Sequence, residues 1–140
     1  HLAPQLPLDC YSRGMGAMGL PGDLSSASRF VRAAFTKLNS RCDGSERQSV
    51  SQFFHILGSV AQQRGCVHLG GERYEETIYS ACCNASRGIY YYKTYENSQI
   101  SAVDLWQEDV DGCTLAAYPL RQGQHIVLQN AKGGAQAQVL

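Results

Sequence analysis

Arg29 is the side chain whose place in the sequence most strongly suggests chemistry. It falls in the first turn of a helix predicted to begin at Ser25, where a cation opposes the helix dipole at a cost of about 0.3–1 kcal/mol. Departures from such local rules tend to mark functional or strained sites. A guanidinium is always charged and carries a rigid donor fork, so Arg29 could polarise an anion or a thiolate. The alternative is a surface arginine that is solvated or paired with Asp23.

A glycine loop precedes Arg29. The stretch Gly14–Gly19 matches the dinucleotide fingerprint G-x-G-x-x-G letter for letter. That fingerprint, however, requires a buried strand before it and a helix that starts on it. Here the polar stretch Tyr11–Arg13 comes before the loop, and Pro21 breaks any helix after it. We therefore predict a loop that allows close approach of the backbone, not a nucleotide site.

The cysteines and histidines show no metal-binding pattern. The chain has six cysteines, and their positions are Cys10, Cys42, Cys66, Cys82, Cys83 and Cys113. Six thiols could form three disulfides, but their density is below that of a disulfide-built scaffold. No C-x-x-C motif occurs, and no histidine lies at a ligand-like spacing from a cysteine, which argues against structural zinc. We predict no metal, reduced and mostly buried thiols, and a cytoplasmic location.

Length and composition exclude several classes of protein. The chain has 140 residues, of which 44% are hydrophobic, so it can form a core rather than a disordered tail. Its formal net charge is zero, which gives it no bulk electrostatic attraction to nucleic acid or to anionic lipid. No apolar run approaches the 18 residues of a membrane span, and we expect no secretory signal in the stretch after His1. We expect neither nucleic-acid nor membrane partners.

Two helices are predicted next along the chain. The first begins after an N-cap that Ser25, Ser26 or Ser28 can supply, ends at Asp43-Gly44, and has an apolar face made of Phe30, Ala34 and Leu38. The second begins at a capping box, Ser45–Gln48, and continues to about Gln63 before Gly65 closes it. An apolar stripe at helical spacing predicts that this second helix faces a core. The stripe consists of Val50, Phe53, Phe54, Leu57, Val60 and Ala61.

An antiparallel sheet is predicted after the helices, because the hydrophobic period falls toward two and the connections are short. The four predicted strands are Thr77–Cys83, Ile89–Tyr95, Gln99–Trp106 and Cys113–Leu120, with His125–Gln129 as a candidate last strand. Two helices followed by such a sheet predict the α+β class. We expect a Gly/Pro-rich loop segment over residues 1–24, the helix pair and sheet over 25–130, and a frayed tail over 131–140.

Several stretches resemble the choloylglycine hydrolase family, which contains the conjugated bile salt hydrolases and the penicillin V acylases. The resemblance covers nearly the whole chain to about Asn130, in the right order. It is carried by Gly19–Asp23, Ser25–Phe35, Gln52–Leu57, Gly88–Tyr92, Thr94–Asn97 and Gln99-Ile100. It implies that the chain is the C-terminal part of an αββα N-terminal-nucleophile hydrolase sandwich, with the segment 1–24 bordering the active site.

The resemblance also implies a mechanism. A cysteine at the mature N-terminus attacks the amide, its own α-amino group serves as the base, and water resolves the acyl-enzyme. Asparagine groups form the oxyanion hole, and Arg29 matches the family's C-terminal catalytic arginine. The chain begins with His1, however, and Cys10 is internal and has no free α-amine. We therefore expect a fragment that supplies Arg29 and scaffold but lacks the nucleophile and is inactive alone.

The expected activity of the intact protein is hydrolysis of glycine- or taurine-conjugated bile salts to free bile acid and amino acid. It would take place in the cytoplasm of a gut bacterium, without a cofactor, in a homotetramer. One alternative is a penicillin V acylase-type amidase. The other is an inactive fragment that acts only as an association module through its uncovered apolar surface.

Overall fold

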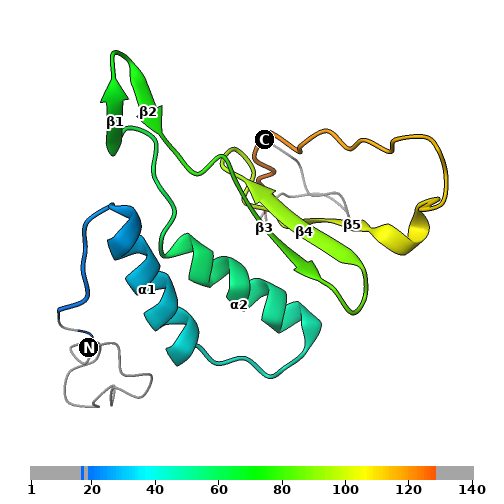
Figure 1. Cartoon of the computed structure of the whole chain (residues 1–140), viewed down its shortest axis with the longest axis horizontal. Helices are drawn as coiled ribbons and strands as arrows, with labels where there is room; N and C mark the ends of the chain where they lie inside the picture. Colours follow the sequence, from blue (N-terminus) through cyan, green and yellow to red (C-terminus); the bar gives the residue numbers. More distant parts are fainter. Residues whose placement is uncertain (1–16, 18, 129–140) are drawn as a thin grey trace. The chain divides into compact units, whose positions relative to one another are not determined.

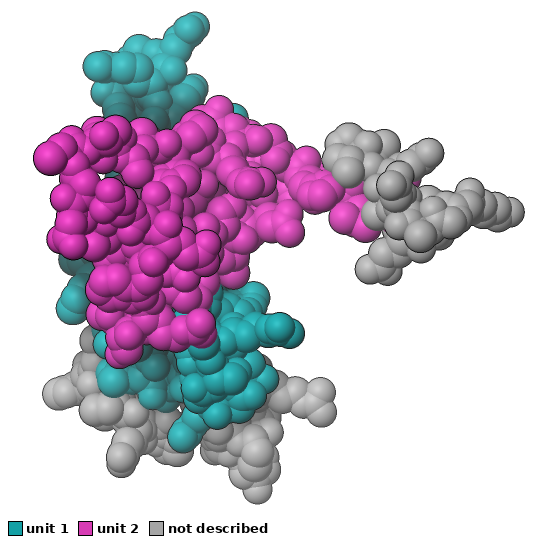
Figure 2. All heavy atoms as spheres, turned by 90° about the vertical axis from the view of Figure 1, so that its right-hand side faces the viewer, with its two compact units in different colours: residues 1–77 teal, residues 78–140 magenta. Residues whose placement is uncertain are grey.

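The computed structural model describes residue 17 and residues 19–128. The chain divides into two compact units, residues 1–77 and residues 78–140 (Figure 2). Within the described part, unit 1 contains two helices and a two-stranded hairpin, and unit 2 contains a three-stranded antiparallel sheet (Figure 1).

Helix α1 spans Ser26–Asn39 and begins where the sequence predicts. The side chain of its N-cap, Ser25, accepts a hydrogen bond from the backbone N–H of Ser28 at 3.3 Å. The helix ends four residues before Asp43 because Asn39 and Ser40 turn their side chains back onto the carbonyls of the last turn. Two residues of the predicted apolar face are exposed within the structure: Phe30 at 72% and Leu38 at 52%.

Helix α2 spans Glu46–Gly58 and lies beside α1 (Figure 1). One half of the predicted capping box is present, because the Ser45 hydroxyl accepts from the backbone N–H of Gln48 at 3.3 Å. The other half is absent: Asp43 accepts from the Ser45 N–H at 2.8 Å instead. The helix stops at Gly58 rather than near Gln63 because the following residues form tighter turns.

The apolar stripe of α2 lies on the covered side of this helix, as predicted. Phe54 is buried, at 4% exposure, and no other member of the stripe is classed as exposed. The ring of Phe53 meets that of Phe54 edge-on, with centroids 5.9 Å apart.

A hairpin formed by β1 (Val67–Gly70) and β2 (Arg73–Glu75) was not predicted. Gly70 and Gly71 both have positive φ, at 97° and 63°, which permits the tight reversal. The strands are short and almost entirely exposed, so they lack the apolar alternation that reveals a strand in a sequence.

The sheet of unit 2 confirms three of the predicted strands. It contains β3 (Tyr79–Asn84), β4 (Ile89–Thr94) and β5 (Ser101–Asp104), in the order β3-β4-β5 with antiparallel neighbours. Tyr92 and Thr94 of β4 are the buried side chains of this sheet, at 7% and 9% exposure, and Tyr92 pairs with Ala81 on β3 and with Ser101 on β5.

The prediction of a strand at Cys113–Leu120 is wrong, because these residues are irregular. Pro119 lacks the N–H that a ladder needs, and the Tyr118 hydroxyl donates to the Glu108 carboxylate, which ties the segment to residues just after β5. Of the candidate strand His125–Gln129, only Val127 forms an isolated bridge, and Gln129 lies outside the described residues. Most of the expected loop segment 1–24 and all of the expected tail 131–140 also lie outside them.

No helix in the described part of the chain is long and apolar enough to cross a membrane. Few side chains there are deeply buried, and the core of each unit is small: Phe54 in unit 1 and Tyr92 in unit 2 are the hydrophobic residues classed as buried among those described. Much apolar surface therefore remains uncovered.

Candidate active site

Arg29 lies near the start of α1 and is half-buried. Its backbone N–H donates to the Ser25 carbonyl at 2.9 Å, so it belongs to the first helical turn as predicted. Its side-chain Nε donates to the Val60 carbonyl at 2.8 Å, just beyond the end of α2. The structure thus shows Arg29 held against a backbone carbonyl, and shows no pairing with Asp23.

The Asp23 carboxylate accepts hydrogen bonds from residues at the start of the same helix. It accepts from the Ser25 backbone N–H at 2.9 Å and from the Ser28 hydroxyl at 2.5 Å. Hydrogen bonds to the Ser25 and Ser28 side chains and to the Ser25 backbone lower the pKa of Asp23 from 3.8 to about 2. Arg32 fixes the same segment, because its Nη1 donates to the Asp23 carbonyl at 2.9 Å. The entry to α1 is therefore held on both sides.

Replacing Asp23 with asparagine is expected to destabilise the fold at neutral pH, and this destabilisation should become smaller in acid. Because the folded pKa lies below the unfolded one, the stabilisation by the carboxylate is present above about pH 4 and is lost as the pH falls toward 2. The difference in unfolding free energy between the wild type and Asp23→Asn should therefore shrink over that range, as measured by urea unfolding followed by circular dichroism.

Asp111→Asn serves as the control for that measurement, because Asp111 is exposed and has no hydrogen bond among the described residues. It should leave the pH dependence unchanged. A difference between wild type and Asp23→Asn that is constant from pH 7 to pH 2 would contradict the assignment of the Asp23 hydrogen bonds.

Unit 1 has unsatisfied polar atoms on the residues around Arg29. The two Nη groups of Arg29 have no hydrogen-bond partner among the described residues. Within the same part of the chain, Arg32 Nε and Gln62 Oε1 are buried without a partner. A guanidinium whose Nε is occupied and whose Nη fork is free can bind or stabilise an anionic group, in either a ground state or a transition state.

The described cysteines are free thiols, but the prediction that most are buried is wrong. Cys42, Cys66, Cys83 and Cys113 are exposed, and Cys82 is half-buried. Burial raises the pKa of the Cys82 thiol, and the neighbouring Cys83 raises it further. A raised pKa disfavours the thiolate, so Cys82 is poorly suited as a nucleophile. Cys10 lies outside the described residues.

No group of three or more potential metal ligands occurs in the described ranges, residue 17 and residues 19–128. Of the glycine loop Gly14–Gly19, only Ala17 and Gly19 are described. Gly19 has a φ of 91°, and Leu20 donates to the Ala17 carbonyl at 3.1 Å, so a turn leads toward α1. The other loop positions, and with them the proposed close approach of the backbone, lie outside the described residues.

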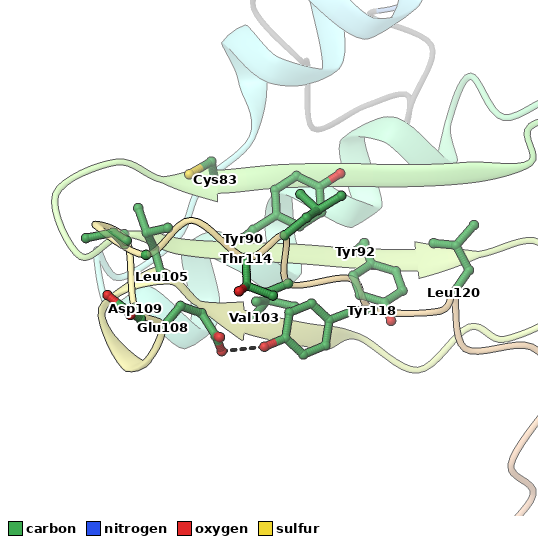
Figure 3. Close-up of a pocket in the computed structure, with 15 residues that line it drawn as sticks. Cys83, Tyr90, Tyr92, Val103, Leu105, Glu108, Asp109, Thr114, Tyr118 and Leu120 are labelled. Carbon is green, nitrogen blue, oxygen red and sulfur yellow. Dashed lines mark hydrogen bonds between the residues drawn. The ribbon is translucent and has the colours of Figure 1, made fainter.

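Unit 2 carries an apolar groove of about 570 Å³ that sequence reasoning did not identify. Tyr90 and Tyr92 of β4 and Val103 of β5 lie on one side of it, and the irregular segment bearing Tyr118 lies across from them (Figure 3). The charged residues that line it are acidic, Glu108 and Asp109. The groove therefore suits an apolar ligand better than a carboxylate, and it contains no counterpart of Arg29.

The alternation of Tyr90 and Tyr92 was a usable signal for one wall, because residues two apart on a strand share a face. No such pattern marks the facing wall, because the sequence of the segment 113–120 predicts a further strand. The groove belongs to unit 2, whereas Arg29 belongs to unit 1.

Comparison with known proteins assigns the chain to a family. A family model described as linear amide C–N hydrolases, choloylglycine hydrolase family, matches residues 3–118. The bile salt hydrolase/transferase of Lactiplantibacillus plantarum is 62% identical over 117 residues, which are 84% of this chain and 36% of that protein. The bile salt hydrolase/transferase of Clostridium perfringens is 40% identical over 111 residues, or 79% of this chain and 34% of that protein.

Solved structures agree with the sequence matches. A mutant of the conjugated bile acid hydrolase from Clostridium perfringens has a TM-score of 0.75 at 39% identity, over 84% of this chain and 36% of that one. The penicillin V acylase of Agrobacterium tumefaciens has a TM-score of 0.57 at 19% identity, over 67% of this chain and 30% of that one, and shows the fold alone.

The predicted α+β class and its placement within the N-terminal-nucleophile hydrolase fold are confirmed by these structures. The chain spans about a third of the length of the relatives it matches. The match to residues 3–118 includes Arg29 and both helices. The chain belongs to the choloylglycine hydrolase family of linear amide C–N hydrolases.

Proposed function

We propose that this chain is the arginine-bearing portion of a cysteine N-terminal-nucleophile amidase that hydrolyses glycine- or taurine-conjugated bile salts. The cysteine thiolate attacks the amide carbonyl and the amine of glycine or taurine leaves. Water then cleaves the thioester to give the free bile acid and the thiol. This chain supplies Arg29 and scaffold, and the nucleophilic cysteine is supplied by the part of the polypeptide that the chain does not cover.

The observation that carries this proposal is the hydrogen bonding of the Arg29 side chain. Its Nε is held by the Val60 carbonyl at 2.8 Å, and its Nη fork has no partner among the described residues. In the proposed enzyme this fork lies beside the thiolate, which it stabilises by its fixed positive charge. The 62% identity to a bile salt hydrolase/transferase supports a bile salt substrate. No cofactor is required, because the nucleophile, base and electrostatic groups are all side chains or chain termini.

We further propose a cytoplasmic homotetramer for the intact protein, in which the segment 1–24 borders the active site. The uncovered apolar surface of both units supports a larger assembly, since side chains such as Phe30, Trp106 and Leu115 are exposed. The same surface favours the second candidate, an association module without activity of its own.

A hybrid enzyme tests the function. In the Lactiplantibacillus plantarum bile salt hydrolase/transferase, the segment matching this chain is replaced by that of this chain, which is 62% identical to it. The hybrid is expected to release taurine from taurocholate at a rate within about tenfold of the parent, because the shared fold preserves the position of Arg29. The purified 140-residue chain alone should release none.

Three outcomes would contradict the proposal. Hydrolysis of taurocholate by the 140-residue chain alone would show that the chain contains its own nucleophile. A hybrid that folds and cleaves penicillin V faster than taurocholate would favour the penicillin V acylase-type amidase. A hybrid that folds and cleaves neither, beside an active parent, would favour the association module.

A further inference from the structure

We propose that Thr77 is a positioning residue for Arg29, which it controls through the carbonyl of Val60. The inference rests on the proposed function only where it concerns catalysis. Its structural part concerns two hydrogen bonds within unit 1, one between Thr77 and Gln62 and one between Arg29 and Val60, which the short segment from Val60 to Gln62 connects.

The bond between Arg29 and Val60 sets the direction of the guanidinium. It joins residues 31 positions apart, with the Nε of Arg29 as donor and the Val60 carbonyl as acceptor at 2.8 Å. Because the Nε–H bond lies in the plane of the guanidinium, a hydrogen bond at Nε restricts the directions in which both Nη groups can point. The orientation of the free Nη fork therefore depends on where the Val60 carbonyl points.

On its N-terminal side, Val60 is held by the end of α2. Its N–H donates to the Leu57 carbonyl at 3.1 Å, and the N–H of Ala61 donates to the Gly58 carbonyl at 3.4 Å. Ser59 donates its N–H to His55 and Ile56 and its hydroxyl to Ile56. The peptide that carries the Val60 carbonyl thus follows a tight turn that continues the helix.

On the C-terminal side, the same segment is held by Thr77. The N–H of Gln62 donates to the Thr77 hydroxyl oxygen at 2.8 Å, and the N–H of Thr77 donates back to the Gln62 carbonyl at 3.1 Å. These reciprocal bonds join positions 15 residues apart. Gln62 is only 3% exposed, so water cannot readily replace the hydroxyl as the acceptor for its N–H.

Thr77 is therefore the side chain that completes the hold on the segment from Val60 to Gln62, because its other bonds, apart from that of Arg29, are made between backbone groups. Thr77→Val keeps the shape of the side chain and removes the acceptor, whereas Thr77→Ser keeps the acceptor. Thr36→Val is the matched control, since the Thr36 hydroxyl bonds to the Arg32 carbonyl at 2.8 Å and has no link to Val60. Thr77→Ala is a second test variant that does not depend on the fit of valine.

The first measurement uses the 140-residue chain and does not depend on catalysis. The hydrogen exchange of the Arg29 Nε–H is followed by ¹H–¹⁵N NMR. Thr77→Val is expected to speed this exchange by about tenfold or more, because the Val60 carbonyl loses its fixed direction. Thr77→Ser and Thr36→Val should leave it within about twofold of the wild type. Unchanged exchange in Thr77→Val, or in Thr77→Ala where the valine variant does not fold, would overturn the proposal.

The second measurement uses the hybrid enzyme. Thr77→Val is expected to lower kcat for taurocholate by about tenfold with little change in KM, and the loss should disappear in an Arg29→Ala background. An equal loss in both backgrounds would show a merely structural role and overturn the proposal. If the exchange of the Arg29 Nε–H responds to Thr77 but the unmutated hybrid is inactive, the structural inference stands and the proposed function fails.

Discussion

Arg29→Ala in the hybrid enzyme is expected to lower kcat for taurocholate by about 100-fold or more. The estimate follows from the cost of removing one preorganised charge or donor from the reacting groups of an acyl-transfer enzyme. Arg29 is suited to that role because the Val60 carbonyl holds its Nε at 2.8 Å and its Nη groups have no other partner among the described residues. The measurement is the initial rate of taurine release under saturating substrate.

The pH profile distinguishes an electrostatic role of Arg29 from a structural one. A guanidinium beside a thiolate favours the ionised form, so its removal raises the pKa of the nucleophilic thiol. The acidic limb of the rate profile of Arg29→Ala should move to higher pH, and part of the lost rate should return in alkaline buffer. A uniform loss at every pH would contradict the electrostatic role.

Two further substitutions serve as controls. Arg29→Lys keeps the charge but loses the fork that is fixed at Nε, so its pH profile should stay close to that of the parent while kcat falls by about tenfold. Arg47→Ala removes an exposed arginine of α2 and should leave the rate unchanged. If Arg29→Ala keeps kcat within about threefold of the unmutated hybrid, the catalytic assignment is wrong.

The helices and the first three strands of the sheet were predictable because their signals are local. The Ser45 cap, the stripe that contains Phe54 and the alternation around Tyr92 each depend on residues only a few positions apart. The exposed hairpin β1–β2 escaped prediction because no apolar alternation accompanies its turn at Gly71. The segment 113–120 has the composition of a strand, but its pairing is decided by tertiary contacts that local patterns do not contain.

The candidate site was only partly predictable for the same reason. Arg29 stood out because a cation in the first helical turn breaks a local rule. Its partner, the Val60 carbonyl, lies 31 positions away and belongs to the backbone, and no sequence pattern marks it. Thr77 is still less visible, because its bond to Gln62 depends on how the α2–β1 connection meets the residues that follow β2. The sequence therefore identifies Arg29 as a candidate, but it does not reveal the long-range hydrogen bonds to the backbone that position its side chain.

Gly88→Ala is expected to lower the free energy of unfolding of the 140-residue chain by about 2 kcal/mol, from two causes. Gly88 has a φ of 64°, and a side chain in this left-handed region costs about 1–2 kcal/mol. A Cβ at this position would also lie 2.5 Å from Trp106 Nε1 and 2.8 Å from its Cε2, so the indole must move. Because Trp106 is 65% exposed, the indole can swing toward solvent, and the added cost is at the low end of the roughly 1–3 kcal/mol typical of overpacking.

Urea unfolding measures this change, and the fluorescence of Trp106, the only tryptophan of the chain, reports the displaced indole. Gly44→Ala is the matched control, because Gly44 has a φ of 84° but its Cβ would meet nothing within 4 Å. It should therefore show the backbone cost alone, with unchanged fluorescence.

In a Trp106→Ala background, followed by circular dichroism, the cost of Gly88→Ala should fall to that of Gly44→Ala. An equal cost of Gly88→Ala with and without the indole would show that Trp106 does not pack on Gly88.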